Sequence, residues 1–388
     1  MCFLPTAKTI LKEQAVADKQ CWHIGNFAPI SVEQANFFTE KLLYWNEHQN
    51  KREMPWKGIS DPYKIWLSEI ILQQTRVAQG LPYYQKFATA FPDIHALANA
   101  SQDEVMTLWQ GLGYYSRARN LHATAQYISR ELGGVFPNTY VQIRQLTGVG
   151  DYTAAAIASF AYNLPHAVLD GNVFRVLARY FGIEQATDET ATRKHFATLA
   201  QQLLPPTKAG KYNQAIMDFG AEVCTPALPD CANCVLQTQC TAFAAQKVNE
   251  LPIKSKKIKI KHRYFVFLYL HNEAQFFIEK RTEADIWQNL YQLPLIEVKN
   301  AKMFENINPL LQQNWGVETT NLQLSKVFVQ QLTHQKIHAV FAEAFMKKEL
   351  NTLTIPATWL LIFKKNYINF AFPKLINLFL SNIALTST

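Results

Sequence analysis

The chain has 388 residues, more than one ordinary domain holds, which predicts two or three domains. Hydrophobic residues make up 48% of it and charged residues 18%, a balance that excludes an intrinsically disordered protein. It has neither a membrane-length apolar run nor the apolar core of a signal peptide, so we expect a cytoplasmic protein with no membrane partner. The net charge of +8 favours a polyanionic partner, although a solvated basic surface explains it equally well.

The first half of the chain has the pattern of a helical protein. Residues 1–30 show no clear period and are expected to form an N-terminal extension. Ser31, with Gln34 three residues later, predicts a capping box at the start of a helix, and Pro62 opens a second helix. Further helical segments separated by proline and glycine follow, so the region 31–245 is predicted to be all-α.

The second half has a different pattern. Lys254–Arg263 is rich in lysine and is expected to be an exposed linker. Tyr264–His271 and Gln275–Lys280 are rich in aromatic and β-branched residues and predict a hairpin. With a further strand predicted over His338–Phe345, this half is expected to be an α+β domain.

Four of the six cysteines lie close together, at Cys224, Cys231, Cys234 and Cys240. In a reducing compartment such clustering indicates metal ligation in preference to disulfides. Both a structural zinc ion and an iron–sulfur cluster use four thiolates, and the spacing alone favours zinc as the commoner use.

A glycine-rich turn at Gly148 and Gly150 lies between two helical segments. Backbone N–H groups at such a turn can hold a phosphate, but a plain corner between two helices has the same pattern.

Two carboxylates are candidates for chemistry. Glu69 lies among apolar residues of a predicted helix, where burial would raise its pKa and suit a general acid, although most glutamates of amphipathic helices are solvated or paired. Asp170 precedes a predicted helix, and its local pattern is that of a simple helix cap.

Together, the glycine turn, Asp170 and the cysteine loop resemble the helix-hairpin-helix DNA glycosylase superfamily. Endonuclease III-like members carry a lysine nucleophile two residues after the second hairpin glycine, where this chain has Tyr152. The resemblance is to the MutY-type adenine DNA glycosylases, strongly from about residue 32 to 250 and more weakly to about 380. The motifs that carry it are Ser-Glu at 68–69, Leu-Gln-Gln-Thr at 72–75, Gly-Leu-Gly-Tyr-Tyr-Ser-Arg at 111–117 and Asp-Gly-Asn at 170–172.

The resemblance implies roles for the catalytic residues. Glu69 would protonate the adenine ring, and Asp170 would stabilise the oxocarbenium ion of the sugar. Asn172 and Tyr152 would orient that centre. The cofactor would be a [4Fe-4S] cluster, held by Cys224, Cys231, Cys234 and Cys240.

The resemblance also implies contacts with duplex DNA. Gln74 and Tyr114 would wedge into the duplex where the adenine leaves the stack, since flipping a base costs energy. Gly148 and Gly150 would hold a backbone phosphate. The residues expected at the mouth of the substrate site are Arg52 and Trp56.

The C-terminal part resembles the Nudix-like domain of these enzymes. It lacks the glutamate box of Nudix hydrolases, so it is expected to bind and not to hydrolyse. Thr333 and His334 are the candidates for reading 8-oxoguanine, although Leu332 stands where the family has phenylalanine. Lys57 likewise replaces an arginine of the family, which removes a planar donor fork.

The sequence therefore predicts a multidomain protein: an all-α helix-hairpin-helix glycosylase region with an iron–sulfur loop, then an α+β Nudix-like domain. Its expected function is monofunctional removal of adenine paired with 8-oxoguanine or guanine in double-stranded DNA, by a monomer. The alternatives are an endonuclease III-like glycosylase with lyase activity and a non-catalytic DNA-binding paralogue. The expected segments are an N-terminal extension (1–30), a catalytic region (31–223), a cluster loop (224–245), a basic linker (246–262) and a recognition domain (263–388).

Overall fold

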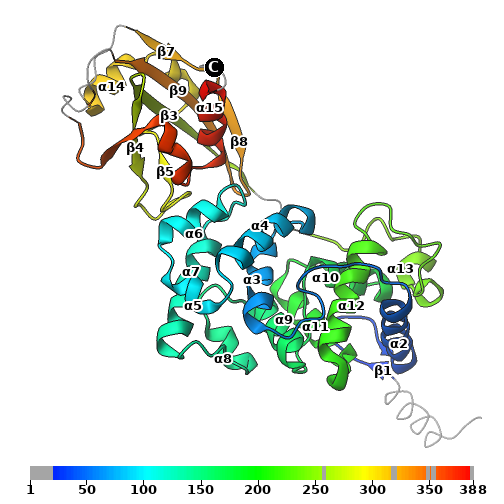
Figure 1. Ribbon diagram of the computed structural model, residues 1–388. Helices are drawn as coiled ribbons and strands as arrows, with labels where there is room; N and C mark the ends of the chain where they lie inside the picture. Colours follow the sequence, from blue (N-terminus) through cyan, green and yellow to red (C-terminus); the bar gives the residue numbers. More distant parts are fainter. Residues whose placement is uncertain (1–20, 256–258, 316–320, 347–349, 351–354, 385–388) are drawn as a thin grey trace, which may run out of the picture. The chain divides into compact units, whose positions relative to one another are not determined.

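The computed structural model describes residues 21–255, 259–315, 321–346, 350 and 355–384 (Figure 1). The chain forms two compact units. Unit 1 comprises residues 1–73 and 130–256, and unit 2 comprises residues 74–129 and 257–388. The predicted extension and the predicted linker lie partly outside the described residues.

Unit 1 is helical, as the sequence predicts. Ser31 caps the first helix by accepting a hydrogen bond from Gln34 N–H, while the Gln34 side chain donates to Gln239 O and leaves the predicted capping box half formed. Pro62 is the first residue of the next helix. The helices are α2 (Val32–His48), α3 (Pro62–Leu72), α8 (Tyr140–Gln145), α9 (Asp151–Tyr162), α10 (Gly171–Phe181), α11 (Thr190–Leu203), α12 (Ala209–Glu222) and α13 (Thr241–Ala244).

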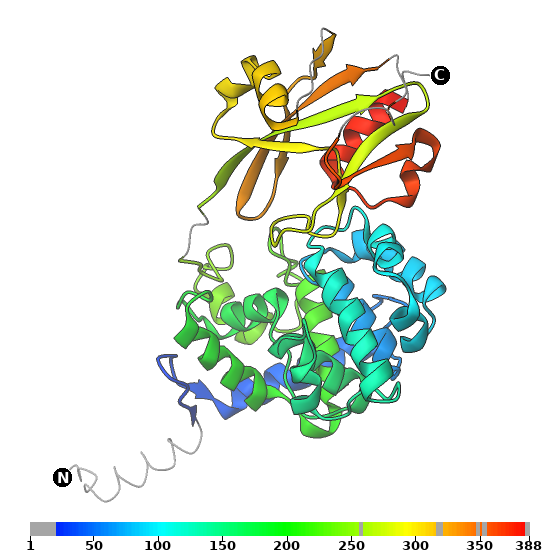
Figure 2. The ribbon, with the colours of Figure 1, turned by 90° about the vertical axis from the view of Figure 1, so that its left-hand side faces the viewer.

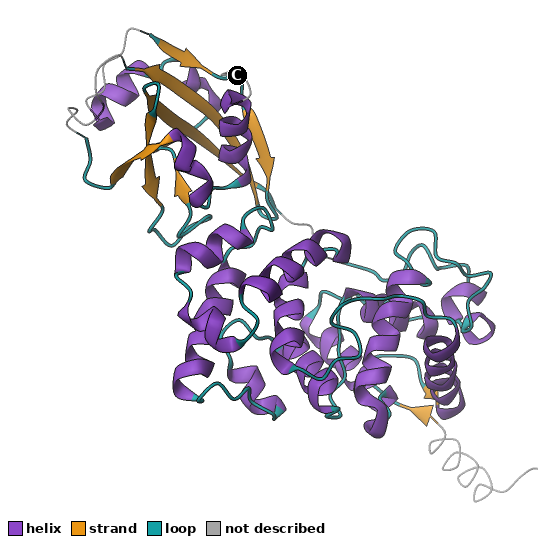
Figure 3. Ribbon diagram, viewed as in Figure 1, coloured by secondary structure: helices purple, strands orange, loops and turns teal. Residues whose placement is uncertain are grey.

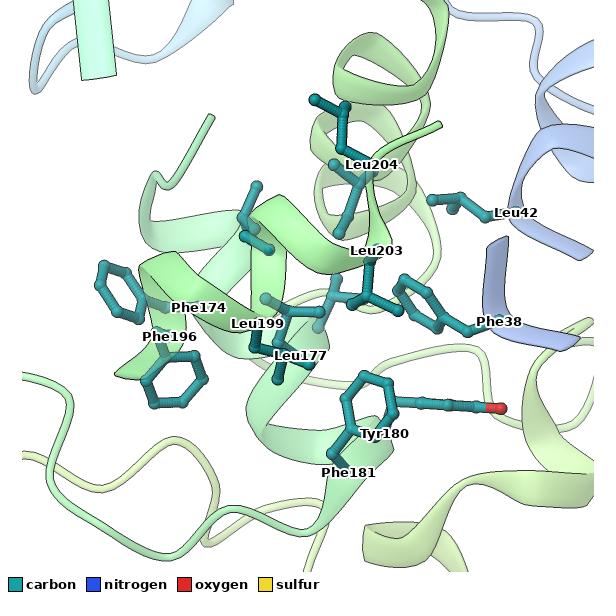
Figure 4. Packing of buried hydrophobic residues seen from close by; sticks show 14 of the residues in the cluster. Phe38, Leu42, Phe174, Leu177, Tyr180, Phe181, Phe196, Leu199, Leu203 and Leu204 are labelled. Carbon is teal, nitrogen blue, oxygen red and sulfur yellow. The ribbon is translucent and has the colours of Figure 1, made fainter. Parts of the chain in front are cut away.

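The main core of unit 1 joins α2, α10, α11 and α12. Phe38 and Leu177 are fully buried within it, next to Tyr180 (Figure 4). Residues 21–30, for which the sequence predicted no element, also contribute to this core. They form the short pair β1 (Cys21–Trp22) and β2 (Ile30–Ser31), and their buried side chains are Ile24, Phe27 and Ile30.

Unit 2 combines helices with one eight-stranded sheet (Figure 3). Its helices are α4 (Val77–Ala90), α5 (Ile94–Asn99), α6 (Gln102–Trp109), α7 (Ser116–Glu131), α14 (Asn308–Trp315) and α15 (Lys374–Ala384). The strands are β3 (Lys261–His271), β4 (Gln275–Lys280), β5 (Tyr291–Gln292), β6 (Leu295–Val298), β7 (Leu322–Leu324), β8 (Phe328–Gln331), β9 (Gln335–Phe345) and β10 (Trp359–Phe363). The predicted β3–β4 hairpin and the predicted strand within β9 are confirmed.

The centre of the sheet is the parallel pair β3 and β9, with β4 and β10 on one side and β7 and β8 on the other. Helix α15 lies on one face of the sheet and α14 on the other (Figure 2). Phe379 of α15 stacks on Phe341 of β9 with the ring centroids 3.9 Å apart, and Leu311 of α14 belongs to the same buried cluster as Val266 of β3. The predicted fold class, a helical region followed by an α+β domain, is confirmed. Among the described residues, no helix has both the length and the apolar character that a membrane span requires.

Candidate active site

Glu69 is a carboxyl buried in the middle of α3. Its exposed fraction is 6%, and the residues of α3 around it are buried as well. Burial raises its pKa to about 7, the nearby Tyr152 hydroxyl lowers the pKa, and repulsion from Asp170 raises it further. Glu69 can therefore be protonated near neutral pH, which suits a general acid.

Tyr152 lies at the start of α9, close to both carboxyls. Its hydroxyl donates to Met217 Sδ of α12 at 4.0 Å and is near enough to Glu69 to lower the pKa of that carboxyl. Burial, with the charges of Glu69 and Asp170, raises its pKa well above the ordinary value. The phenol consequently stays neutral and acts as a hydrogen-bond donor.

Asp170 is the N-cap of α10, so the expectation that it caps a helix is confirmed. Its Oδ1 accepts from Val173 N–H at 2.8 Å, and its Oδ2 accepts from Asn172 Nδ2 at 2.9 Å. Burial raises its pKa, whereas these hydrogen bonds and the charge of Arg175 oppose the rise. The cap thus supplies donors that favour the carboxylate in a desolvated position.

Arg175 links Asp170 to the cysteine loop. The sequence did not lead us to predict this residue as part of the site. Its Nη2 donates to Asn172 Oδ1 at 2.9 Å, and its Nε donates to Cys224 O at 2.7 Å. Asn172 is therefore held between Asp170 and Arg175. A signal was available, because Arg175 and Arg179 are the only cations of the apolar helix α10.

The four cysteines of the loop form no disulfide, and all are half-buried. Burial raises the pKa of the Cys234 thiol to about 12, and the neighbouring thiols Cys224, Cys240 and Cys231 raise it further. Arg179 Nη1 lies 3.5 Å from Cys224 Sγ and so brings a buried positive charge to the group. In the part of the chain that is described, no three His, Cys, Asp or Glu side chains lie close enough to hold a single metal ion.

The glycine turn between α8 and α9 forms as expected. Gly148 has φ +80°, which favours glycine, and Gly150 is the N-cap of α9. A Cβ on Gly150 would meet nothing within 4 Å, so the glycine leaves the helix N-terminus open towards solvent. Arg144 braces the turn by donating to Val149 O at 3.0 Å.

The loop that carries Arg52 and Trp56 lies beside a cavity of about 600 Å3. Both Arg52 and Lys57 pair with the fully buried Asp218 of α12, at 2.7 and 2.9 Å. Lys57 therefore fills the place of the family's arginine as a second cation on one carboxylate. Trp56 itself is buried, with an exposed fraction of 8%.

Unit 2 brings Tyr114 and the predicted recognition residues together. The Tyr114 hydroxyl hydrogen-bonds with Thr333 Oγ1, and both residues line a cavity of about 520 Å3 together with His334. Thr333 and His334 form the tip of the β8–β9 hairpin, where Leu332 N–H donates to Gln335 O. The structure thus brings Glu69, Tyr152 and Asp170 together in unit 1, and Tyr114, Thr333 and His334 together in unit 2.

Comparison with known proteins gives the class first. The sequence profile of the HhH-GPD superfamily base excision DNA repair proteins matches residues 67–202, which include Glu69, Tyr152 and Asp170. A thermostable thymine-DNA glycosylase of known structure is similar at 28% identity and a TM-score of 0.51, over 55% of this chain and 98% of that chain. The family match and the fold identify the chain as a DNA glycosylase of the base excision repair type.

Curated relatives give the family. An adenine DNA glycosylase of Buchnera aphidicola subsp. Acyrthosiphon pisum is 36% identical over 266 residues, 69% of this chain and 76% of the relative. The enzyme of the same name from Buchnera aphidicola subsp. Baizongia pistaciae is 34% identical over 330 residues, 84% of this chain and 87% of the relative. The chain belongs to the adenine DNA glycosylase family.

Proposed function

We propose that this adenine DNA glycosylase cleaves the N-glycosidic bond with two carboxyls in different protonation states. The observation that carries the proposal is the pKa of about 7 at Glu69, raised by burial and by the neighbouring Asp170. Glu69 donates a proton to the adenine ring and turns the base into a leaving group. Asp170, whose carboxylate accepts the hydrogen bonds of its cap, stabilises the positive charge that develops on the sugar.

The reaction is monofunctional hydrolysis. Tyr152 occupies the place where a lyase would carry its lysine amine, and a phenol forms no Schiff base with the sugar. Its neutral hydroxyl instead orients Glu69. The product is an intact strand with an abasic site.

The substrate is adenine opposite 8-oxoguanine or guanine in duplex DNA. Adenine is a normal base, so the catalytic pocket cannot distinguish a mispair from a correct pair, and another group must read the opposite base. Thr333 and His334 stand at a hairpin tip, and their polar groups suit the edge of a purine. Gln74 and Tyr114 keep the duplex open, Gly148 and Gly150 hold a phosphate, and the loop with Arg52 and Trp56 borders the substrate.

The four cysteines of the loop hold a [4Fe-4S] cluster. The donor set supports this, because it consists of four thiols beside the guanidinium of Arg179. When bound, the cluster supplies a rigid centre that orders the loop.

The test is a single-turnover assay on duplexes with adenine opposite 8-oxoguanine, guanine or thymine, each with and without alkali. We expect excision from both mispairs, strand breaks only after alkali, and none with Glu69→Gln. Breaks without alkali would assign a lyase, and tight binding without excision would assign a DNA-binding paralogue. Iron and zinc contents of the purified protein test the cluster separately.

A further inference from the structure

Arg117 lies between the two segments that carry the proposed wedges, Gln74 and Tyr114. It is in the first turn of α7, and its exposed fraction is 7%. Its Nη2 donates to Gly113 O at 3.2 Å and to Thr75 Oγ1 at 3.4 Å. Arg117 thus contacts Thr75, which follows Gln74, and Gly113, which precedes Tyr114.

The guanidinium also supports the Tyr114 ring directly. Its Cζ lies 5.5 Å from the centre of that ring and 5.0 Å from the ring of the fully buried Trp109. Trp109 Nε1 donates to the same Gly113 O at 3.0 Å. A planar cation stacked on aromatic rings while it forks to two acceptors is a task for arginine that lysine cannot perform.

Both wedges are held in an unfavourable backbone conformation. Gln74 has φ +55° and Tyr114 has φ +48°, in the left-handed region that side chains other than glycine rarely adopt. Such residues persist only where their surroundings determine the conformation. The contacts of Arg117 with Thr75 and Gly113 can fix the backbone conformation of both segments.

We propose that Arg117 is a positioning residue that holds Gln74 and Tyr114 together in the conformation that keeps the duplex open. The inference rests on the wedge role given to these two residues in the proposed function. Loss of Arg117 should then slow base flipping and leave the chemical step unchanged. A base with no partner on the opposite strand costs less to extrude, because no base pair has to be broken, so its excision should depend less on Arg117.

The experiment compares two substrates under single turnover: adenine opposite guanine, and adenine opposite an abasic site. The variants are Arg117→Lys, which keeps the charge, and Thr75→Val, which removes one acceptor and leaves the buried arginine in place. Arg130→Met, an exposed arginine at the end of the same helix, is the control. Thermal unfolding of each variant confirms the fold.

We expect Arg117→Lys to slow excision opposite guanine by about tenfold or more, from the loss of a charged hydrogen bond and its stacking. Thr75→Val should show a smaller loss, Arg130→Met none, and all variants should approach the wild-type rate opposite the abasic site. An equal loss on both substrates, or no loss, overturns the inference. Tyr114→Ala is measured beside them: if it is slow while Arg117→Lys is normal, only the inference fails, and if it is normal, the wedge role fails with it.

Discussion

Replacing Glu69 by glutamine should make the protein inactive and, at alkaline pH, more stable. The carboxyl is buried, and its pKa rises from 4.5 to about 7 because the charged form is desolvated. Glutamine has nearly the same shape, carries no charge, and can still accept a hydrogen bond from the Tyr152 hydroxyl. The substitution therefore removes the cost of a buried charge without opening a cavity.

The sign and size of the effect follow from proton binding. Because the folded-state pKa is the higher one, the folded protein binds more protons than the unfolded chain between pH 4.5 and about 7, and stability falls as pH rises through that window. Below pH 4.5 the carboxyl is protonated in both the folded and the unfolded state, so burying it carries no charge penalty. Above about pH 7 the full penalty for the buried charge applies, and the shift in pKa from 4.5 to about 7 corresponds to about 3 kcal/mol of unfolding free energy.

The assay is thermal unfolding of the wild type and Glu69→Gln between pH 4.5 and 8.5, with single-turnover excision measured in parallel. The midpoint of the variant should match the wild type at the acid end and exceed it increasingly towards pH 8. A difference that does not change with pH, or a less stable variant at pH 8, would refute the assignment of Glu69 as a desolvated acid.

Four further outcomes are expected. The single-turnover rate of the wild type should fall as pH rises through about 7, because only protonated Glu69 donates; a flat profile would exclude it as the acid. Asp170→Asn keeps a residue that can cap α10 but removes the charge, so excision should drop about a hundredfold or more while DNA affinity in a gel shift is retained. Arg175→Met leaves Asn172 without its donor and should lower the excision rate roughly tenfold at unchanged affinity. Thr333→Ala should reduce the preference for 8-oxoguanine over guanine by roughly 1–3 kcal/mol, read from the ratio of the two rates.

Elements with strong local signals were predictable from the sequence. Ser31 and Pro62 begin helices because a hydroxyl cap and a proline in the first turn satisfy helix termini locally. The strands around Tyr264 and His338 follow from side chains that suit a sheet buried on both faces. Glu69 was recognisable because a carboxyl among apolar helix residues has an unusual pattern.

Features that depend on tertiary contacts were not predictable. No sequence period shows that Asp218 binds both Arg52 and Lys57, or that Arg175 reaches Cys224 O, since these pairs form only when segments distant in the sequence pack together. Similarly, the core contributed by residues 21–30 comes from a few apolar side chains without periodicity.

Helix α10 gives the cysteine loop a physical connection to the catalytic centre. Asp170 caps its N-terminus, where the helix dipole favours an anion. Further along the helix, Arg175 donates to Cys224 O at 2.7 Å, and Arg179 donates to Thr225 O at 2.7 Å. Arg175 also holds Asn172, the side chain that donates to Asp170, so one guanidinium connects the loop to the carboxylate. The proposed cluster would take no part in bond cleavage, yet by ordering the loop it would keep a donor of Asp170 in place and so influence the rate.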